Sequence, residues 1–274
     1  MRRTGWTTLV ATIAATAFAG CGGGTTSTTS TTTRGTVDPA ALRAVASGSE
    51  RLQDAGSAHF TLDGRFTIQD ESIPIHSSGS MTISGAPRGR LDQTMRIPGP
   101  SEGHTTELDV ETRIIGDQLY MRMPEEAVED PARPWRVQTM PPEMMQASDP
   151  SFQARVMRYA TAAERIGPER VGGVRTTRYR VTVDYGALAK SGPASMRKLA
   201  EAMIAADIDR EQTSEVWIDG DGVPRRLHAE VTTGDHEVAS TIDIRIDDLG
   251  VPVHVEAPPA DQVTEESATQ PTPS

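Results

Sequence analysis

The chain has 274 residues, of which 36% are hydrophobic and 24% charged, a composition typical of a soluble globular protein with one large domain or two small ones. Its formal net charge of −11 argues against nucleic acid as a partner and against a broad electrostatic contact with an anionic membrane. Aromatic residues make up only 4%, so aliphatic residues and the 11 methionines must fill the interior.

The N-terminus has the order of features found in an export signal. Two arginines precede an uncharged apolar segment at Trp6–Phe18, which Ala19-Gly20 and then Cys21 follow. Small residues before a cysteine resemble the bacterial lipobox, although Phe18 stands where that motif usually has leucine. We therefore predict that residues 1–20 are a lipoprotein signal peptide. Cys21, the only cysteine, would then carry a diacylglyceryl group that anchors the chain to a membrane.

Two other interpretations of this segment remain open. One is a plain secretory signal with Cys21 left as a free thiol, and the other is an N-terminal transmembrane helix. The apolar segment is short for a membrane span, and no stop-transfer pattern follows it. The lipoprotein interpretation also explains why an exported chain would keep one cysteine, because lipidation caps the thiol.

Composition divides the rest of the chain into three parts. Residues 21–37 are almost entirely Gly, Thr and Ser, which predicts a disordered tether. Residues 38–258 form the predicted folded domain, which opens with a short helix whose first residues are Asp38 and Pro39. Residues 259–274 are acidic and rich in proline, and we predict a disordered tail.

From Ala58 onward the apolar residues recur at every second position, which predicts strands with one buried face. Gly116-Asp117 is typical of a hairpin turn. The pattern therefore predicts a five-stranded antiparallel meander. Its strands cover residues 58–69, 73–83, 91–97, 108–114 and 119–123.

The second half of the chain predicts helices between further strands. Asp149-Pro150 begins a helix that runs to Ala163, Gly172-Gly173 is typical of a hairpin, and a further helix covers Ala194–Ile208. Because no linker separates the two β regions, we expect one curved sheet of about nine or ten strands. The later extended segments are residues 135–137, 177–183, 215–219, 225–233 and 238–246, with an edge segment at 251–255.

Two serine motifs have letters in common with known catalytic sites. Gly99–Gly103 has the letters of a nucleophile elbow, but it lies between two predicted strands instead of between a strand and a helix. Ser195–Lys198 has the serine and lysine spacing of penicillin-binding enzymes, but the other boxes of those enzymes are missing. We therefore predict no catalytic residues.

Metal-binding patterns are equally weak. Asp219–Gly222 could begin a calcium loop, but the closing twelfth position falls on Glu230 in the middle of a predicted strand, so a hairpin turn is the better interpretation. The six histidines form no i, i+4 pair, so a metal site could arise only through the fold. We predict neither a metal site nor a cofactor.

Methionines occur in the apolar phase of both strands and helices. For any one of them, gap-filling in a packed core is an adequate explanation. As a set, apolar side chains on a strongly curved sheet with few aromatic residues predict a pocket for alkyl chains. The candidates for its lining are Leu62, Phe66, Met81, Ile83, Leu91, Met95, Leu108, Val110, Leu119, Met121, Tyr179, Val181, Met196, Leu199, Met203, Ile242 and Ile244.

The exported part of the sequence resembles the actinobacterial lipoproteins typified by LppX and LprG, which share the fold of the LolA and LolB carriers. No single motif is specific, and the resemblance depends on their order and spacing. Besides the lipobox and the tether, they are Ser57–Gly64, Ile115–Met121, Val171–Val174 followed by Tyr179–Val181, Glu215–Asp219, and Asp247–Val253. Leu249 stands where that family often has tryptophan.

This resemblance implies an α+β fold with a single, strongly curved antiparallel β-sheet, a half-barrel of eleven or so strands whose concave face is covered by helices. It also implies a cavity for the acyl chains of envelope lipids or lipoglycans, and a monomer anchored to the outer face of the cell membrane. Such a protein would carry or present lipid without catalysing a reaction. The alternatives are a surface lipoprotein with a filled core that binds an envelope protein as a sensor or scaffold, and a hydrolase with an unrecognised site.

Overall fold

The computed structural model describes most of the predicted domain. The predicted signal peptide, Cys21, the tether and the Gly99–Gly103 motif lie outside the described residues. Within the described part of the chain, no helix is both long and apolar enough to cross a membrane. The described residues are 38–68, 71–84, 87–98, 105–125, 128, 130–140, 156–205, 207–232 and 238–265.

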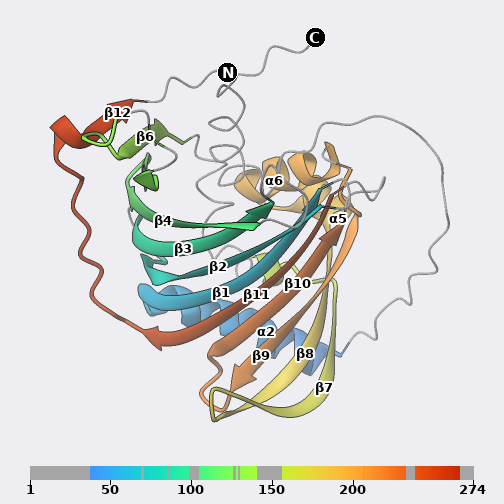
Figure 1. Ribbon diagram of the computed structural model, residues 1–274. Coiled ribbons are helices and arrows are strands. Elements are labelled where there is room, and N and C mark those ends of the chain that lie inside the picture. Colours follow the sequence, from blue (N-terminus) through green and yellow to red (C-terminus); the bar gives the residue numbers. More distant parts are fainter. Residues whose placement is uncertain are drawn as a thin grey trace.

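One sheet of 12 strands forms the body of the protein (Figure 1). Its strands are β1 (Ser57–Ile68), β2 (Glu71–Thr82), β3 (Arg88–Pro98), β4 (Thr105–Ile115), β5 (Gln118–Arg122), β6 (Trp135–Thr139), β7 (Ala162–Val171), β8 (Val174–Asp184), β9 (Glu211–Asp219), β10 (Pro224–Thr232), β11 (Val238–Leu249) and β12 (Val263–Glu265). Their spatial order is β12-β6-β5-β4-β3-β2-β1-β11-β10-β9-β8-β7. Neighbours are antiparallel except β12, which runs parallel to β6.

The sheet has one apolar and one polar face, as the alternation in sequence predicts. In β1, Phe60 is buried on the apolar face, whereas His59 and Asp63 lie on the polar face and bond to groups of β2. Core residues from β4 and β5 belong to the same buried cluster as residues from β8 and β9, far along the strand order. The apolar face is therefore the concave one, and the core lies within it.

Helix α2 (Pro39–Asp54) lies on the apolar face and contacts β7, β9 and β10. The Asp38 side chain caps it by accepting a hydrogen bond from the Ala40 N–H at 2.8 Å, and Pro39 supplies the first helical residue. Its buried stripe, which includes Val45 and Leu52, joins the main core. Figure 1 shows α2 along the far side of the sheet.

Two more helices, α5 (Tyr185–Ser191) and α6 (Ala194–Ala205), follow β8 and form a second core. Asp184 caps α5 by accepting a hydrogen bond from the Ala187 N–H at 2.9 Å. Burial in this second core raises the pKa of Tyr185 to about 12. The buried members are Val156, Val183, Tyr185, Leu188, Met196, Ala200, Met203 and Ile208.

The predicted fold class is confirmed, because one open, mostly antiparallel sheet carries a helix on its apolar face. Three details differ from the prediction. Ala163 lies in β7 instead of at the end of a helix, and helix α5 was not predicted. Residues 251–255 form no strand, whereas residues 260–265 form a 3-10 turn and β12, so the ordered domain extends beyond residue 258 to Glu265. A parallel edge strand made by a short terminal segment leaves no periodic signal in the sequence.

Candidate functional site

Most of the predicted lining residues meet on the concave face of the sheet. Eight of them are buried members of the main core, and four more are partly buried against it. All five strands of the first meander contribute to it, and β8 and β11 contribute from the second β region. The buried group is Met81, Ile83, Leu108, Val110, Leu119, Met121, Val181 and Ile244, and the partly buried group is Leu62, Leu91, Tyr179 and Ile242.

The remaining predicted residues do not join this group. Met196, Leu199 and Met203 on α6 belong to the second core, beyond the end of β8. Phe66, near the end of β1, is partly buried but belongs to neither core cluster. The side chain of Met95 lies outside the described part of the structure. The predicted lining thus divides between two clusters, because helical periodicity in α6 could not indicate which core the helix faces.

The two halves of the concave face differ in what covers them. Helix α2 contacts β7, β9 and β10, and among the described helices none makes a comparable contact with β2 to β5. That second half is nevertheless apolar and buried. Sequence reasoning missed two core methionines: Met140, which directly follows β6, and Met157, which lies within the predicted helix at residues 149–163 but was not chosen as lining. Ile114 and Met123 carried the period-two signal but were not chosen as lining.

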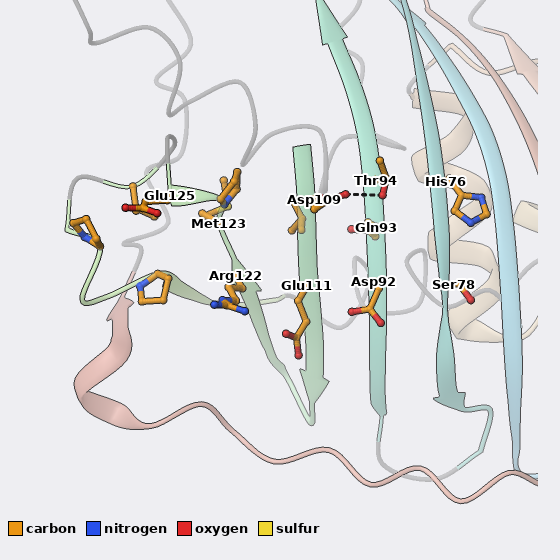
Figure 2. Close-up of a pocket in the computed structure, with 15 residues that line it drawn as sticks. His76, Ser78, Asp92, Gln93, Thr94, Asp109, Glu111, Arg122, Met123 and Glu125 are labelled. Atoms are coloured by element: carbon orange, nitrogen blue, oxygen red, sulfur yellow. Dashed lines mark hydrogen bonds between the residues drawn. The ribbon is translucent and has the colours of Figure 1, made fainter. Parts of the chain in front are cut away.

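A pocket of about 790 Å³ lies at the polar face of β2 to β4, beside the chain segment that follows β5 (Figure 2). It is not the predicted apolar cavity, because only Val110 is common to both. Figure 2 shows Met123 and Glu125 at one side, His76 and Ser78 at the other, and the strand residues between them. The chain between β5 and β6 also lines the pocket, through Pro124, Pro131 and Pro134.

Four carboxylates line the pocket, and most of them already have partners. Asp109 accepts a hydrogen bond from the Thr94 hydroxyl at 2.7 Å, and Glu111 accepts one from Arg113 Nε at 2.9 Å. Asp92 lies 3.5 Å from Arg90 in an exposed pair. Glu125 is exposed at the rim of the pocket. These pairs hold the pocket wall together.

The Asp219–Gly222 segment forms a hairpin turn. Asp219 Oδ1 accepts hydrogen bonds from the N–H groups of Asp221 and Val223, both at 2.9 Å, and Oδ2 accepts one from Arg225 Nε at 2.7 Å. Burial raises the pKa of Asp219, but hydrogen bonds from the Val223 N–H, the Arg225 side chain and the Asp221 N–H, together with the charge of Arg225, lower it by more. The net pKa lies below the ordinary value of this carboxyl. The Asp219 oxygens thus stabilise the turn. Among the described residues, no group of histidines, cysteines and acids could hold a metal.

Arginines cover the tryptophans of the polar face. Trp217 on β9 is only 2% exposed, with Arg178 at 5.2 Å and Arg226 at 4.4 Å from its ring centroid. Trp135 on β6 is covered by Arg113 at 4.5 Å. The polar face therefore buries these two tryptophan rings beneath guanidinium groups instead of exposing them to a ligand.

No protein-family model matches this chain, and no curated protein matches it. Among solved structures, the chain is similar to LprF from Mycobacterium bovis, with 13% identity and a TM-score of 0.47 over 82% of this chain and 99% of that one. It is also similar to the lipoprotein LppX of Mycobacterium tuberculosis, with 17% identity and a TM-score of 0.49 over 80% of this chain and 100% of that one. LppX is one of the two proteins that typify the family named above.

A more distant similarity is to a putative outer membrane lipoprotein-sorting protein domain from Vibrio parahaemolyticus, with 9% identity and a TM-score of 0.29 over 77% of this chain and 92% of that one. These are similarities of fold at low sequence identity. What each of these neighbours binds is a property of that neighbour.

Proposed function

We propose that this chain is a membrane-anchored lipoprotein that binds the acyl chains of envelope lipids or lipoglycans on the concave face of its sheet and carries or presents them. The observation that supports this most directly is the apolar half of that face on β2 to β5, with which α2 makes no contact comparable to its contacts with β7, β9 and β10. An alkyl chain inserted there would lose its contact with water, which favours binding by about 0.8 kcal/mol per methylene.

The side chains of this half-face suit a flexible ligand. Met81, Met121 and Met123 are unbranched, so they can change rotamer and make room for an alkyl chain at a lower cost than β-branched residues. Lipidation at Cys21 would keep the domain where such lipids occur, and the tether at residues 21–37 would let it move above the headgroups.

Native mass spectrometry of the protein from its own host tests the proposal. We expect a lipid-sized mass that leaves the chain on mild organic extraction. Protein that carries no such mass, when purified without detergent, would contradict lipid carriage. The extracted lipid would also identify the ligand.

A second candidate is a lipoprotein with a filled core that binds an envelope protein. The observation that favours it is the depth of burial on the concave face, where Val181 and Met121 are 0% and 2% exposed. In this case the chain should carry no lipid, and crosslinking in cells should join it to a protein partner.

A further inference from the structure

The β7–β8 hairpin differs from the rest of the described surface in its apolar exposure. Ile166 is 40% and Val174 41% exposed, and they are the two exposed large hydrophobic residues in the described part of the chain. A bulge between Arg165 and Gly167 interrupts the pairing of β7 with β8 where Ile166 stands. Bulges re-aim side chains, so this one accounts for an isoleucine that faces solvent.

The turn of this hairpin projects beyond its neighbour in the sheet. β9 ends at Asp219, which is paired with Thr176, so residues 171–174 extend past it. Gly172 and Gly173 have φ values of 54° and 83°, which permits a tight two-residue turn. Figure 1 shows this turn at the lower edge of the molecule, at the opposite end of β8 from α5.

The charge of the hairpin is opposite to that of the whole chain. Of its three carboxylates, Asp184 caps α5, and the other two are paired, Glu164 with Arg180 at 3.4 Å and Glu169 with Arg178 at 3.8 Å. Three arginines therefore remain exposed and without a carboxylate partner among the described residues. They are Arg165, Arg170 and Arg175.

Two of these arginines face each other directly. Arg170 and Arg175 are register partners, and like charges opposite one another destabilise a β pair. Arg170 donates a hydrogen bond to the Gly173 carbonyl at 2.6 Å, which keeps its guanidinium at the turn. An anion placed between the two side chains would remove this repulsion.

We infer that the β7–β8 hairpin docks on an anionic lipid surface, with Ile166 and Val174 entering the headgroup region while Arg165, Arg170 and Arg175 bind lipid phosphates. Arginine near such a surface is attracted to its lipid phosphates, and the effect is confined to about a Debye length. Local attraction therefore coexists with a formal net charge of −11, which turns the rest of the chain away from the membrane.

The position of the proposed anchor is compatible with this orientation. The Asp38 N–H donates a hydrogen bond to the Ala163 carbonyl at 3.1 Å, so the tether joins the domain near the start of β7. From Ala163 to the turn at the other end of β7 the distance is about 26 Å, because a strand rises about 3.3 Å per residue. The tether at residues 21–37 can extend to roughly 55 Å, enough for anchor and hairpin to reach one membrane together.

The inference depends on the proposed membrane anchor, and the following test separates the two. The full lipidated chain carrying Val174→Cys with a neutral fluorophore is reconstituted on vesicles of phosphatidylglycerol and phosphatidylcholine that contain headgroup-quencher lipid. The same label at Lys190→Cys, exposed on α5, is the positional control. Vesicle flotation, measured in parallel, reports the anchor alone.

We expect strong quenching at position 174 and little at position 190. This difference in quenching should disappear on vesicles of pure phosphatidylcholine, and also in 1 M salt, where the Debye length falls to about 3 Å. Arg165→Gln with Arg175→Gln should remove most of the quenching. The control is Arg122→Gln with Arg133→Gln, which replaces two exposed arginines near the opposite end of the strand order from β7 and β8. The quenching at position 174 should remain in this variant.

Flotation with equal quenching at the two positions, or with none at position 174, overturns the hairpin contact and leaves the anchor intact. Absence of flotation on anionic vesicles overturns both. Quenching that survives the Arg165 and Arg175 substitutions, or the high-salt condition, contradicts the electrostatic basis of the contact.

Discussion

At the scale of single residues, the structure accounts for motifs that could have been mistaken for active sites. Asp219 has the sequence context of a calcium ligand, yet its carboxylate satisfies two backbone N–H groups and Arg225. Its side chain is only 4% exposed, so these bonds replace water. Ser195 lies in the first turn of α6.

The Asp219 carboxylate should stabilise the fold in a pH-dependent way. Because its pKa lies below the ordinary value of 3.8, its contribution is present above that value and is lost as the pH falls through the lowered pKa of the folded state. Asp219→Asn should cost about 2 kcal/mol in urea unfolding at pH 7 and less below pH 3.8. Asp221→Asn in the same turn, where the side chain is exposed, should cost under about 0.5 kcal/mol. An equal cost of Asp219→Asn at both pH values would contradict this account.

At the scale of elements, close approach of strands and closure of edges decide stability. β2 and β3 meet at Gly79, which is the register partner of Leu91. At the far end of the sheet, residues 251–262 return from β11 and place β12 against β6. Arg113 helps to hold this return by donating a hydrogen bond to the Glu256 carbonyl at 3.0 Å.

Gly79→Ala should weaken the β2–β3 pair. A Cβ atom there would lie 1.9 Å from the Arg90 carbonyl oxygen and 2.8 Å from Leu91 Cα, so the backbone must move. We expect a loss of about 3 kcal/mol in the free energy of unfolding. Gly220→Ala, where a Cβ would meet nothing within 4 Å, is the control and should change stability by less than about 0.5 kcal/mol. Similar costs for the two variants would disprove the close approach.

Removing β12 should expose the edge of β6. A chain that ends at Ala257 loses the pairing of residues 263–265 with residues 135–137, and we expect about 2 kcal/mol less stability and more aggregation in light scattering. A chain that ends at Glu265 keeps the strand and should behave like the whole protein. Equal scattering from the two truncated chains would indicate that β12 does not protect the edge.

At the scale of the whole molecule, one curved sheet separates an apolar interior from a charged exterior. Helix α2 covers the half of the concave face on β7, β9 and β10, and the half on β2 to β5 is the proposed ligand surface. The polar face carries the pocket of about 790 Å³ and the arginine-covered tryptophans. The proposed lipid contacts therefore lie inside the curve, and the β7–β8 hairpin lies at its margin.

A bulky substitution on each half of the concave face would distinguish a ligand surface from a solid core. Met121→Trp should reduce lipid uptake at a cost of about 1 kcal/mol, because the side chain would occupy space meant for ligand. Val216→Trp on β9, which α2 contacts, should cost more than about 3 kcal/mol, because that half is packed against a helix. A cost above about 3 kcal/mol for Met121→Trp as well would favour the filled-core candidate.

The anchor should be separable from the fold. Cys21→Ala should leave the urea-unfolding transition and lipid binding of the domain unchanged, because Asp38 is the first residue for which the structure describes a domain contact. The variant should leave the membrane fraction on cell fractionation, since each lost acyl chain removes about 0.8 kcal/mol of attachment per methylene. Retention in that fraction would contradict lipidation as the means of attachment.

The sequence by itself determined the elements whose signals are local. The period-two alternation predicted β1 to β5, the Asp38-Pro39 cap predicted α2, and Gly172-Gly173 predicted the β7–β8 turn, because caps, turns and alternation depend on neighbours a few residues away. Twelve of the predicted lining residues also meet in the main core, since they share one phase of that alternation.

Only the tertiary structure decided which distant segments meet. The pairing of β1 with β11 and of β6 with β12, and the assignment of Met196 and Met203 to a separate core, join residues far apart in the chain. The same is true of the pocket on the polar face, which combines β2 to β4 with the segment after β5. Local periodicity shows that a residue has a buried face but not what lies against it, because the partner is chosen by packing across the whole sheet.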